Sequence, residues 1–258
     1  MTHISYSELK NWNDCPFKHK ITYIDGIKGF KGNEYTAFGT AIHDVCENLL
    51  LHPELENEAR MYFDLTFKTE LSLLEENKVS LNSKMIKTMR QQGSDLSVLV
   101  LSAVNKHFEK YEVISTEEKL YEDIEGYEDR FKFKGYIDLV LKTSDEKYHI
   151  IDWKSCSWGW DAKRKSDPMN TYQLTLYKHY FAAKHNIDPE NIETHFALLK
   201  RTAKQDRIEI FKITSGAKKT QNALNLLTKA LHNITRKNYF KNRLSCYRCE
   251  FNKTEYCP

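Results

Sequence analysis

Two aspartates and a lysine lie in the sequence pattern of one β-hairpin. Residues 130–155 contain two alternating runs of apolar and polar residues, separated by the polar segment 143–146, which is typical of a hairpin. Side chains alternate along a strand, so Asp138 lies in the apolar middle of the first strand, whereas Asp152 and Lys154 share a face near the end of the second. Burying three charged groups is costly unless they are paired or bind a metal. The pattern therefore predicts either a cross-strand Asp–Lys pair or a metal-dependent catalytic site.

A histidine in a predicted helix is a second candidate for this site. Apolar residues at helical spacing predict a helix over Phe38–Leu51. Gly39 and His43 lie one turn apart beside its apolar stripe. Taken alone, the histidine is more often a partnered residue at the edge of the core than a metal ligand.

A third polar pair follows the hairpin. Asp167-Pro168 predicts the start of a helix that continues from Met169 to His185. Gln173 and Tyr177 lie one turn apart on a single face of this helix, downstream of the strand that carries the lysine.

The segment after the second hairpin strand combines tryptophans with cations. Aromatic rings and basic groups in one loop suit the stacking of bases and the binding of phosphates, but an ordinary surface loop has the same composition when its tryptophans cover a core. Both interpretations stay open. The candidate nucleic-acid contacts are Trp158, Trp160, Lys163, Arg164, Lys165, Lys200 and Arg201.

Cysteines near the two ends of the chain form a candidate metal site. Cys246, Cys249 and Cys257 lie within twelve residues, and Cys15 precedes a proline near the N-terminus. Clustered cysteines in a chain of this size without an export signal bind metal more often than they form disulfides. Four thiolates suit either an iron–sulfur cluster or zinc.

Composition excludes several classes of protein. The 258 residues carry a net charge of +3, which excludes a histone-like polycation and leaves nucleic-acid binding to local patches. A phosphate-binding GxxxxGK[ST] loop is absent from the sequence, which argues against a nucleotide-driven motor. With no apolar run of signal-peptide or membrane-span length, we expect a soluble, cytoplasmic monomer without membrane contact.

The remaining patterns predict the elements that position these residues. We expect an α/β fold with a mixed central sheet of about five strands flanked by helices. Residues 52–116 are predicted to form a helical insertion, followed by a strand over 119–124; Glu117 or Glu118 at its start either approaches a metal or is solvated. Further strands are predicted over 194–200 and 207–213, and Ser215 is expected to cap a last long helix.

These motifs, in this order, resemble the PD-(D/E)XK nuclease superfamily, in particular its RecB/AddB-like branch with a C-terminal cysteine cluster. The matching segments are Gly39-x-x-x-His43, Gly135-Tyr-Ile-Asp138, Asp152-Trp-Lys154, Gln173-x-x-x-Tyr177, and the segment ISYSELKNWNDCPF together with the cysteine tail. The resemblance implies one nuclease domain over residues 1–258 with a restriction-endonuclease-like core, in which 52–116 is an insertion and Cys15 is stapled to 246–257.

The resemblance also implies how such a site works. His43, Asp138, Asp152 and the backbone carbonyl of Trp153 would hold Mg²⁺ or Mn²⁺, which activates water and polarises the scissile phosphate. Lys154 would orient the water and neutralise developing charge, Gln173 and Tyr177 would orient the catalytic groups, and the product would carry a 5′-phosphate. The cysteines of this branch hold a 4Fe–4S cluster, with Zn²⁺ as the alternative.

The implied function is a metal-dependent deoxyribonuclease. We expect an exonuclease on DNA ends or single strands, in recombination, repair or phage DNA processing, in a bacterium or in the host cytoplasm of a phage. A helicase or a single-strand annealing protein is an expected partner. The alternative is a catalytically degenerate nucleic-acid-binding protein with a structural iron–sulfur or zinc site.

Overall fold

The computed structural model of the protein describes residues 2–258, which fold into two compact units. The first unit consists of Met1–Phe30, Leu120–Gly135 and Gly216–Pro258, and the second of Lys31–Lys119 and Tyr136–Ser215. The sequence analysis expected one domain over residues 1–258 and did not distinguish these two units. No helix in the described part of the chain combines the length and apolar character needed to cross a membrane.

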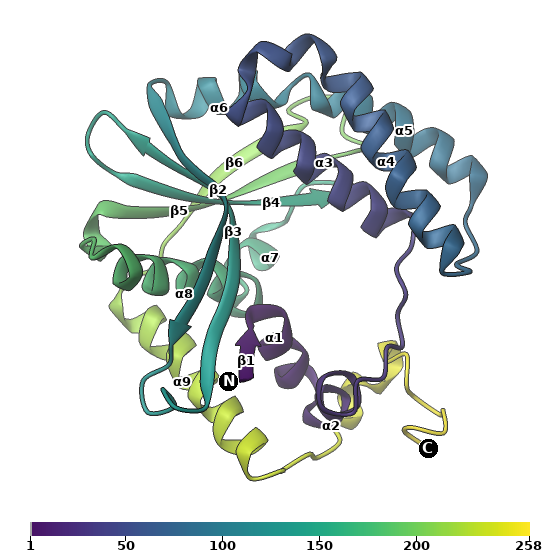
Figure 1. The fold of residues 1–258 in the computed structure, drawn as a ribbon, viewed down its shortest axis with the longest axis vertical. Coiled ribbons are helices and arrows are strands. Elements are labelled where there is room, and N and C mark those ends of the chain that lie inside the picture. Colours follow the sequence, from purple (N-terminus) through teal and green to yellow (C-terminus); the bar gives the residue numbers. More distant parts are fainter. Residues whose placement is uncertain (1) are drawn as a thin grey trace. The chain divides into compact units, whose positions relative to one another are not determined.

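The second unit is built on a mixed sheet (Figure 1). Its strands are β2 (Tyr111–Asp123), β3 (Phe131–Thr143), β4 (Tyr148–Cys156), β5 (Ile192–Lys200) and β6 (Ile208–Ile213), of which β2 and β3 begin or end in the first unit. Strand β4 is central, since it pairs antiparallel with β3 and parallel with β5; β5 pairs antiparallel with β6, and β2 pairs with β3. These five strands and their flanking helices confirm the predicted α/β class.

One face of this sheet is covered by helices that precede it in the chain. Leu139 and Leu141 of β3, together with Ile151 and Trp153 of β4, pack into one core cluster with the apolar residues of these helices. The helices of this cluster are α3 (Glu34–Leu51), α4 (Ala59–Glu76), α5 (Ser83–Ser97) and α6 (Val100–Phe108), with the 3₁₀ turn η2 (Pro53–Glu58) between α3 and α4. Among them, α3, α4 and α5 lie side by side (Figure 1).

Strands β4 and β5 also pack against α8 (Pro168–His185). Asp167 caps this helix by accepting a hydrogen bond from the Met169 N–H at 2.8 Å, as the Asp-Pro pair predicts. The short helix α7 (Ala162–Ser166) precedes α8, and the 3₁₀ turn η3 (Pro189–Asn191) leads into β5.

The first unit joins both ends of the chain. Strand β1 (Thr2–Ser5) pairs in parallel with residues 131–134 of β3, and counted with β1 the sheet has six strands. The Ser5 hydroxyl accepts a hydrogen bond from the Glu8 N–H at 3.1 Å, which confirms the predicted helix start. The other elements of this unit are α1 (Tyr6–Asp14), α2 (Pro16–His19), the π-helical turn η1 (Lys20–Ile24), α9 (Ala217–Thr235) and the 3₁₀ turn η4 (Arg243–Arg248).

Two sequence-based boundaries are wrong. The segment 52–116 is helical only as far as Phe108, because residues 111–116 already belong to β2. Ser215 does not cap α9: Gly216 occupies the cap position without a side-chain hydrogen bond. The Ser215 hydroxyl instead lies 3.0 Å from that of Thr175, with which it forms a buried hydrogen bond.

Candidate active site and cysteine pocket

Asp138 lies at the point where strands β3 and β4 separate. The ladder between them ends at the pair Leu139–Ile151, so the next N–H along β4, that of Trp153, has no partner on the β3 backbone. Asp138 Oδ2 accepts this hydrogen bond at 2.7 Å. The Trp153 side chain is fully buried in the core cluster, so the backbone that presents Asp152 is fixed from both sides.

Asp152 and Lys154 lie on one face of β4, as alternation predicts. Asp152 is 1% exposed, and Lys154 Nζ lies 2.5 Å from its Oδ2. Oδ1 of Asp152 is buried and has no hydrogen-bond partner among residues 2–258. Burial raises the pKa of Asp152 to about 6 despite the lysine, and burial likewise raises the pKa of Asp138 to about 6. The pair along one strand replaces the cross-strand Asp–Lys pair that the sequence allowed.

His43 reaches this site from α3. Its Nδ1 lies 3.6 Å from Asp138 Oδ2, which is too long for a hydrogen bond. Burial and the nearby Lys154 charge lower the pKa of His43 to about 4, so the imidazole is neutral at pH 7 and has a free lone pair. The structure therefore brings His43 together with the two aspartates, as the histidine motif predicts.

Two further acids, Glu47 and Glu117, lie beside these groups. Glu47 is one helical turn after His43, and burial together with the charge of Glu117 and a hydrogen bond to it raises the pKa of Glu47 to about 8. Glu117 has φ +48° within β2, a left-handed conformation rare for a non-glycine residue. Sequence analysis missed Glu47, although its i+4 spacing from His43 places both on one helix face. Of the two acids named for this position, Glu118 pairs instead with Lys184 and His185.

The Gln173–Tyr177 pair faces the same carboxylates from α8. The Gln173 side-chain N–H donates to the Tyr177 hydroxyl at 3.2 Å. Burial, and then the charge of Asp152, raises the pKa of Tyr177, so its hydroxyl remains protonated and can donate. The pair predicted from the Gln-x-x-x-Tyr motif therefore lies close enough to Asp152 to act electrostatically on it.

The loop after β4 forms a cavity of about 320 Å³ that we call the tryptophan pocket. Trp158 is 69% exposed at this pocket, and the Arg201 guanidinium lies 5.1 Å from the centre of the Tyr35 ring. Arg201 also donates to Ser157 Oγ at 2.7 Å. The lining residues are Tyr35, Ser155, Cys156, Ser157, Trp158, Gly159, Arg164 and Arg201.

The other candidate nucleic-acid contacts lie in different environments. Trp160 is buried with its ring centre 5.0 Å from that of Phe196, so it belongs to the core and is not available for stacking on a base. Lys165 and Lys200 both pair with Glu209. Lys163 and Arg164 are exposed, and the Arg164 guanidinium lies 4.7 Å from the centre of the Trp160 ring.

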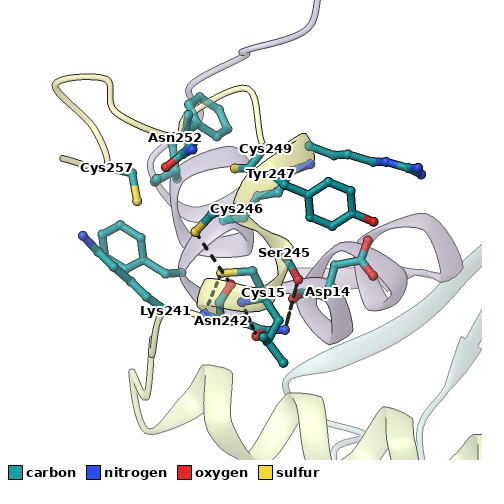
Figure 2. A pocket seen from close by; sticks show the side chains of 16 residues that line it. Asp14, Cys15, Lys241, Asn242, Ser245, Cys246, Tyr247, Cys249, Asn252 and Cys257 are labelled. Carbon is teal, nitrogen blue, oxygen red and sulfur yellow. Dashed lines mark hydrogen bonds between the residues drawn. The ribbon is translucent and has the colours of Figure 1, made fainter.

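In the first unit, the four predicted cysteines line one pocket of about 340 Å³ (Figure 2). Cys15 Sγ accepts a hydrogen bond from the Asn242 N–H at 3.3 Å, and the Asn242 side chain donates to the Asp14 carbonyl at 2.8 Å. All six cysteines of the chain are free thiols. No three of the pocket's sulfurs lie within 4.8 Å of one another in the described chain. The pocket therefore gathers the cysteines in space without forming a compact tetrahedral set.

The candidate site residues fit a bound divalent cation. Two carboxylates with raised pKa values, of which Asp152 is buried and has an unpartnered oxygen, and a neutral imidazole are hard and borderline ligands of the kind that Mg²⁺ and Mn²⁺ accept. The ligand atoms of Asp138, Asp152 and His43 do not all lie within 4.8 Å of one another. In this structure the positive charge next to Asp152 is the Lys154 ammonium.

Two solved structures are similar to this chain. The structure is similar to the crystal structure of a Eubacterium rectale protein named "Putative exonuclease", with a TM-score of 0.59 and 15% sequence identity over 96% of this chain and 85% of that one. A second structure, that of SSO0001, matches with a TM-score of 0.39 and 18% identity over 81% of this chain and 82% of that one. A search of curated proteins finds no match.

At such identities the likeness to the first structure shows the fold alone. The sequence itself carries the family assignment, because the profile of a nuclease family matches residues 3–258, nearly the whole chain. Members of that family typically use a divalent metal and act on nucleic acid. The chain belongs to the PD-(D/E)XK nuclease superfamily.

Proposed function

We propose that this protein is a Mg²⁺- or Mn²⁺-dependent DNA exonuclease of the RecB/AddB-like branch. The observation that carries the proposal is the pair of carboxylates, Asp138 (13% exposed) and the buried Asp152, with Lys154, held where β3 and β4 separate. A structural ion pair needs only one carboxylate for the lysine. A second carboxylate and a neutral histidine at the same place leave the negative charge uncompensated unless a cation binds.

Each residue has a defined task in this proposal. Asp138, Asp152 and His43 hold the cation, together with the Trp153 carbonyl, and the cation supplies Lewis-acid chemistry and a more acidic water. Lys154 orients the attacking water and neutralises charge that develops on the phosphate. Gln173 orients the Tyr177 hydroxyl, which donates a hydrogen bond toward the Asp152 carboxylate or the bound substrate. The product carries a 5′-phosphate.

The DNA-binding surface includes the tryptophan pocket and the cations near it. Trp158 supplies an exposed ring for a base, and Arg164 and Lys163 supply exposed positive charge for phosphates. Arg201 is buried and donates to Gln92 and Ser157, so it adds to the positive field from below the surface. Lys165 and Lys200 contribute to the same positive field, although Glu209 partly neutralises them. Trp160 supports this surface from the core, where it packs under Arg164.

This surface can be tested by neutralising the three consecutive cations 163–165 with glutamine. Each phosphate contact to duplex DNA contributes about −0.9 to the slope of log K against log salt, so losing them should weaken binding and flatten that slope. Fluorescence anisotropy over a salt series measures both quantities. Unchanged affinity and slope would place the DNA elsewhere. The exposed lysines Lys229, Lys237 and Lys253, in the other unit, provide a control that removes the same number of charges.

The nuclease activity itself needs one comparison. End-labelled linear DNA and closed circular DNA are incubated with Mg²⁺, Mn²⁺ or EDTA, with the wild type and Asp152→Asn. Loss of label from linear DNA alone, dependent on metal and on Asp152, supports an exonuclease. Cleavage of the circle indicates an endonuclease instead.

A different class of function is a catalytically degenerate DNA-binding protein. Its expected signature is tight DNA binding without product under every metal condition, equal for the wild type and Asp152→Asn. The intact carboxylates and lysine favour the enzyme. Processes that need such an exonuclease are recombination, repair and phage DNA processing, alongside a helicase or a single-strand annealing protein.

We further propose that the cysteine pocket holds a 4Fe–4S cluster, bound by Cys15, Cys246, Cys249 and Cys257. Four thiolates around a single tetrahedral zinc would lie about 3.8 Å apart, given Zn–S bonds of about 2.3 Å. In the described chain no three of these sulfurs lie within 4.8 Å of one another, so a single zinc would require the side chains to move. The pocket volume of about 340 Å³ leaves space for a 4Fe–4S cluster.

The metal in this pocket can be identified from anaerobically purified protein. A 4Fe–4S cluster gives a brown protein with four irons per chain, and Cys249→Ser should lose both colour and iron. A colourless protein with one zinc per chain, lost in the same variant, would overturn the iron–sulfur assignment and keep the metal staple. Cys46→Ser, a buried cysteine of the other unit, is the matched control.

A further inference from the structure

Two histidines and a glutamate of the second unit converge on one point. His149 Nδ1 lies 3.1 Å from His195 Nε2, and Glu193 Oε2 lies 4.0 Å and 3.9 Å from these two nitrogens. In residues 2–258 this is the one group in which three candidate ligand atoms lie within 4.8 Å of one another. His149 is on β4, and Glu193 and His195 are on β5, which pairs with it.

The hydrogen bonds around His149 fix which of its nitrogens carries the proton. The Thr143 hydroxyl donates to Asp145 Oδ1 at 2.5 Å and lies 2.9 Å from His149 Nε2. Because the hydroxyl has a single proton, His149 Nε2–H must donate to it. Nδ1 of His149 therefore has a lone pair, which accepts a hydrogen bond from the His195 Nε2–H at 3.1 Å in the metal-free protein; a metal ion would take the place of this proton. Ligating histidines are typically held by such a second hydrogen bond from the other ring nitrogen.

His195 is also neutral. Its side chain is 4% exposed, and its Nδ1 is buried without a partner among the described residues. A positive charge on this buried ring would be costly, so His195 is a neutral imidazole, and its proton lies on Nδ1 when Nε2 binds a metal. The rings of Phe108 and His107, both on α6, lie 5.3 Å and 5.7 Å from the His195 ring, so the cluster has an apolar side and one further imidazole.

Glu193 uses its two oxygens differently. Oε1 lies 2.6 Å from Lys212 Nζ and 3.4 Å from Lys147 Nζ. Oε2 faces the two imidazoles. The lysines orient the carboxylate, as partners of ligating carboxylates do, and also oppose a cation through their charge. The charged and titratable groups around the cluster are Lys147, Lys212, Asp145 and His107.

We propose that His149, His195 and Glu193 form a Zn²⁺ site that is independent of the catalytic site. Ligands of a tetrahedral zinc with bonds of about 2.0 Å lie about 3.3 Å apart, close to the 3.1 Å between the two nitrogens. Glu193 Oε2 closes the set after a shift of less than about 1 Å. Two imidazoles and a carboxylate suit zinc better than Mg²⁺, which prefers oxygen ligands. A water, or His107 after a rotamer change, completes the fourth position.

The position of this site indicates a structural role. His149 lies on the opposite face of β4 from Asp152, because side chains three residues apart alternate faces. A cation bound there joins β4, the strand that carries Asp152 and Lys154, to its neighbour β5. Zinc then stabilises the sheet without taking part in phosphodiester hydrolysis.

The test measures zinc binding directly. Wild type, His149→Gln, His195→Gln and Glu193→Gln are stripped with EDTA, dialysed against Zn²⁺ and analysed for metal per chain. We expect each variant to retain one zinc fewer than wild type and to lose the zinc-dependent rise in Tm. His52→Gln, an exposed histidine beside Glu54, should bind as much as wild type. All these variants keep the six cysteines, so zinc bound in the cysteine pocket is the same in each and cancels in the comparison with wild type.

The possible outcomes are distinct. Equal zinc content in wild type and all three variants overturns the site. If a histidine variant fails to fold, Glu193→Gln still decides, since Glu193 is partly exposed and should show at least about tenfold weaker zinc binding. The zinc measurement does not depend on whether the proposed nuclease activity is found. Where that activity is present, DNA cleavage in Mg²⁺ should be unchanged in Glu193→Gln.

Discussion

Replacing Asp152 with asparagine should abolish DNA cleavage and at the same time stabilise the metal-free protein. The Asp152 carboxylate is buried with one unpartnered oxygen, and its pKa is raised from 3.8 to about 6. A difference of about 2 pKa units corresponds to about 3 kcal/mol of unfavourable free energy for keeping the charge in the folded state above pH 6. Asparagine removes this charge and keeps the shape.

The favourable charge of Lys154 is already included in this figure, because the lysine lowers the pKa of Asp152 against the larger effect of burial. The expected net stabilisation of Asp152→Asn is therefore about 3 kcal/mol at pH 8.

The pH dependence gives the sign of the effect. A carboxyl whose pKa is higher in the folded than in the unfolded state contributes stability that is fully present below pH 4 and is lost as the pH rises through 6. Wild type should lose stability across this window, whereas Asp152→Asn should lose less. The advantage of the variant is then close to zero at pH 4 and largest above pH 6.

Urea unfolding in EDTA from pH 4.5 to 8, with linear extrapolation, measures this difference. Adding Mg²⁺ or Mn²⁺ at pH 8 should stabilise wild type more than the variant, because the metal binds the folded carboxylates. Asp129→Asn, at an exposed carboxylate, is the control and should show no such pattern. A variant that is less stable than wild type at pH 8, or equally displaced at every pH, would refute the reasoning.

Three further predictions follow from the same structure. Trp158→Ala should weaken DNA binding by about 1–3 kcal/mol in anisotropy titrations without changing Tm, whereas Trp160→Ala should cost about 3–5 kcal/mol of stability in urea unfolding. Gly93→Ala should cost about 1–3 kcal/mol, because the added Cβ would lie 1.9 Å from the Phe63 ring; a Tm equal to wild type would contradict the packing of α4 on α5. His43→Gln should need at least about tenfold more Mn²⁺ for half-maximal cleavage, and an unchanged requirement would remove it from the ligand set.

The elements that depend on local signals could be predicted from the sequence. Alternation in 130–155 predicted β3, β4 and the faces on which Asp138 and Asp152 lie. Asp167-Pro168 and Ser5 predicted two helix starts because their side chains cap the helices locally. Such signals need no knowledge of distant contacts.

Other features have no local signal. Helix α6 ends at Phe108, and the next residue, Glu109, has φ +53°, a conformation that sequences usually mark with glycine or asparagine. The helical pattern therefore seemed to continue through Tyr111, which is in fact the first residue of β2. Ser215 looked like a cap, but tertiary contacts with Thr175 take its hydroxyl into the core.

Part of the candidate site could not be predicted from the sequence either. Glu47 and Glu117 are seventy residues apart in the sequence, and only the folded sheet brings them together. The tryptophan pair was ambiguous for a similar reason, since composition does not reveal that Trp160 packs on Phe196 while Trp158 is exposed.

The hydrogen bond between Asp138 and the Trp153 amide makes that single N–H an intrinsic probe of the site. Its acceptor is a side chain and not a neighbouring strand, so its exchange with deuterium depends on the Asp138 carboxylate. A cation that draws electron density from Oδ2 weakens this bond and shifts the amide resonance, while the amides of Ile151 and Leu139 in the regular ladder stay unchanged. In an isotope-labelled sample, the Trp153 amide resonance would therefore report whether a metal is bound, even for a variant that does not cleave DNA.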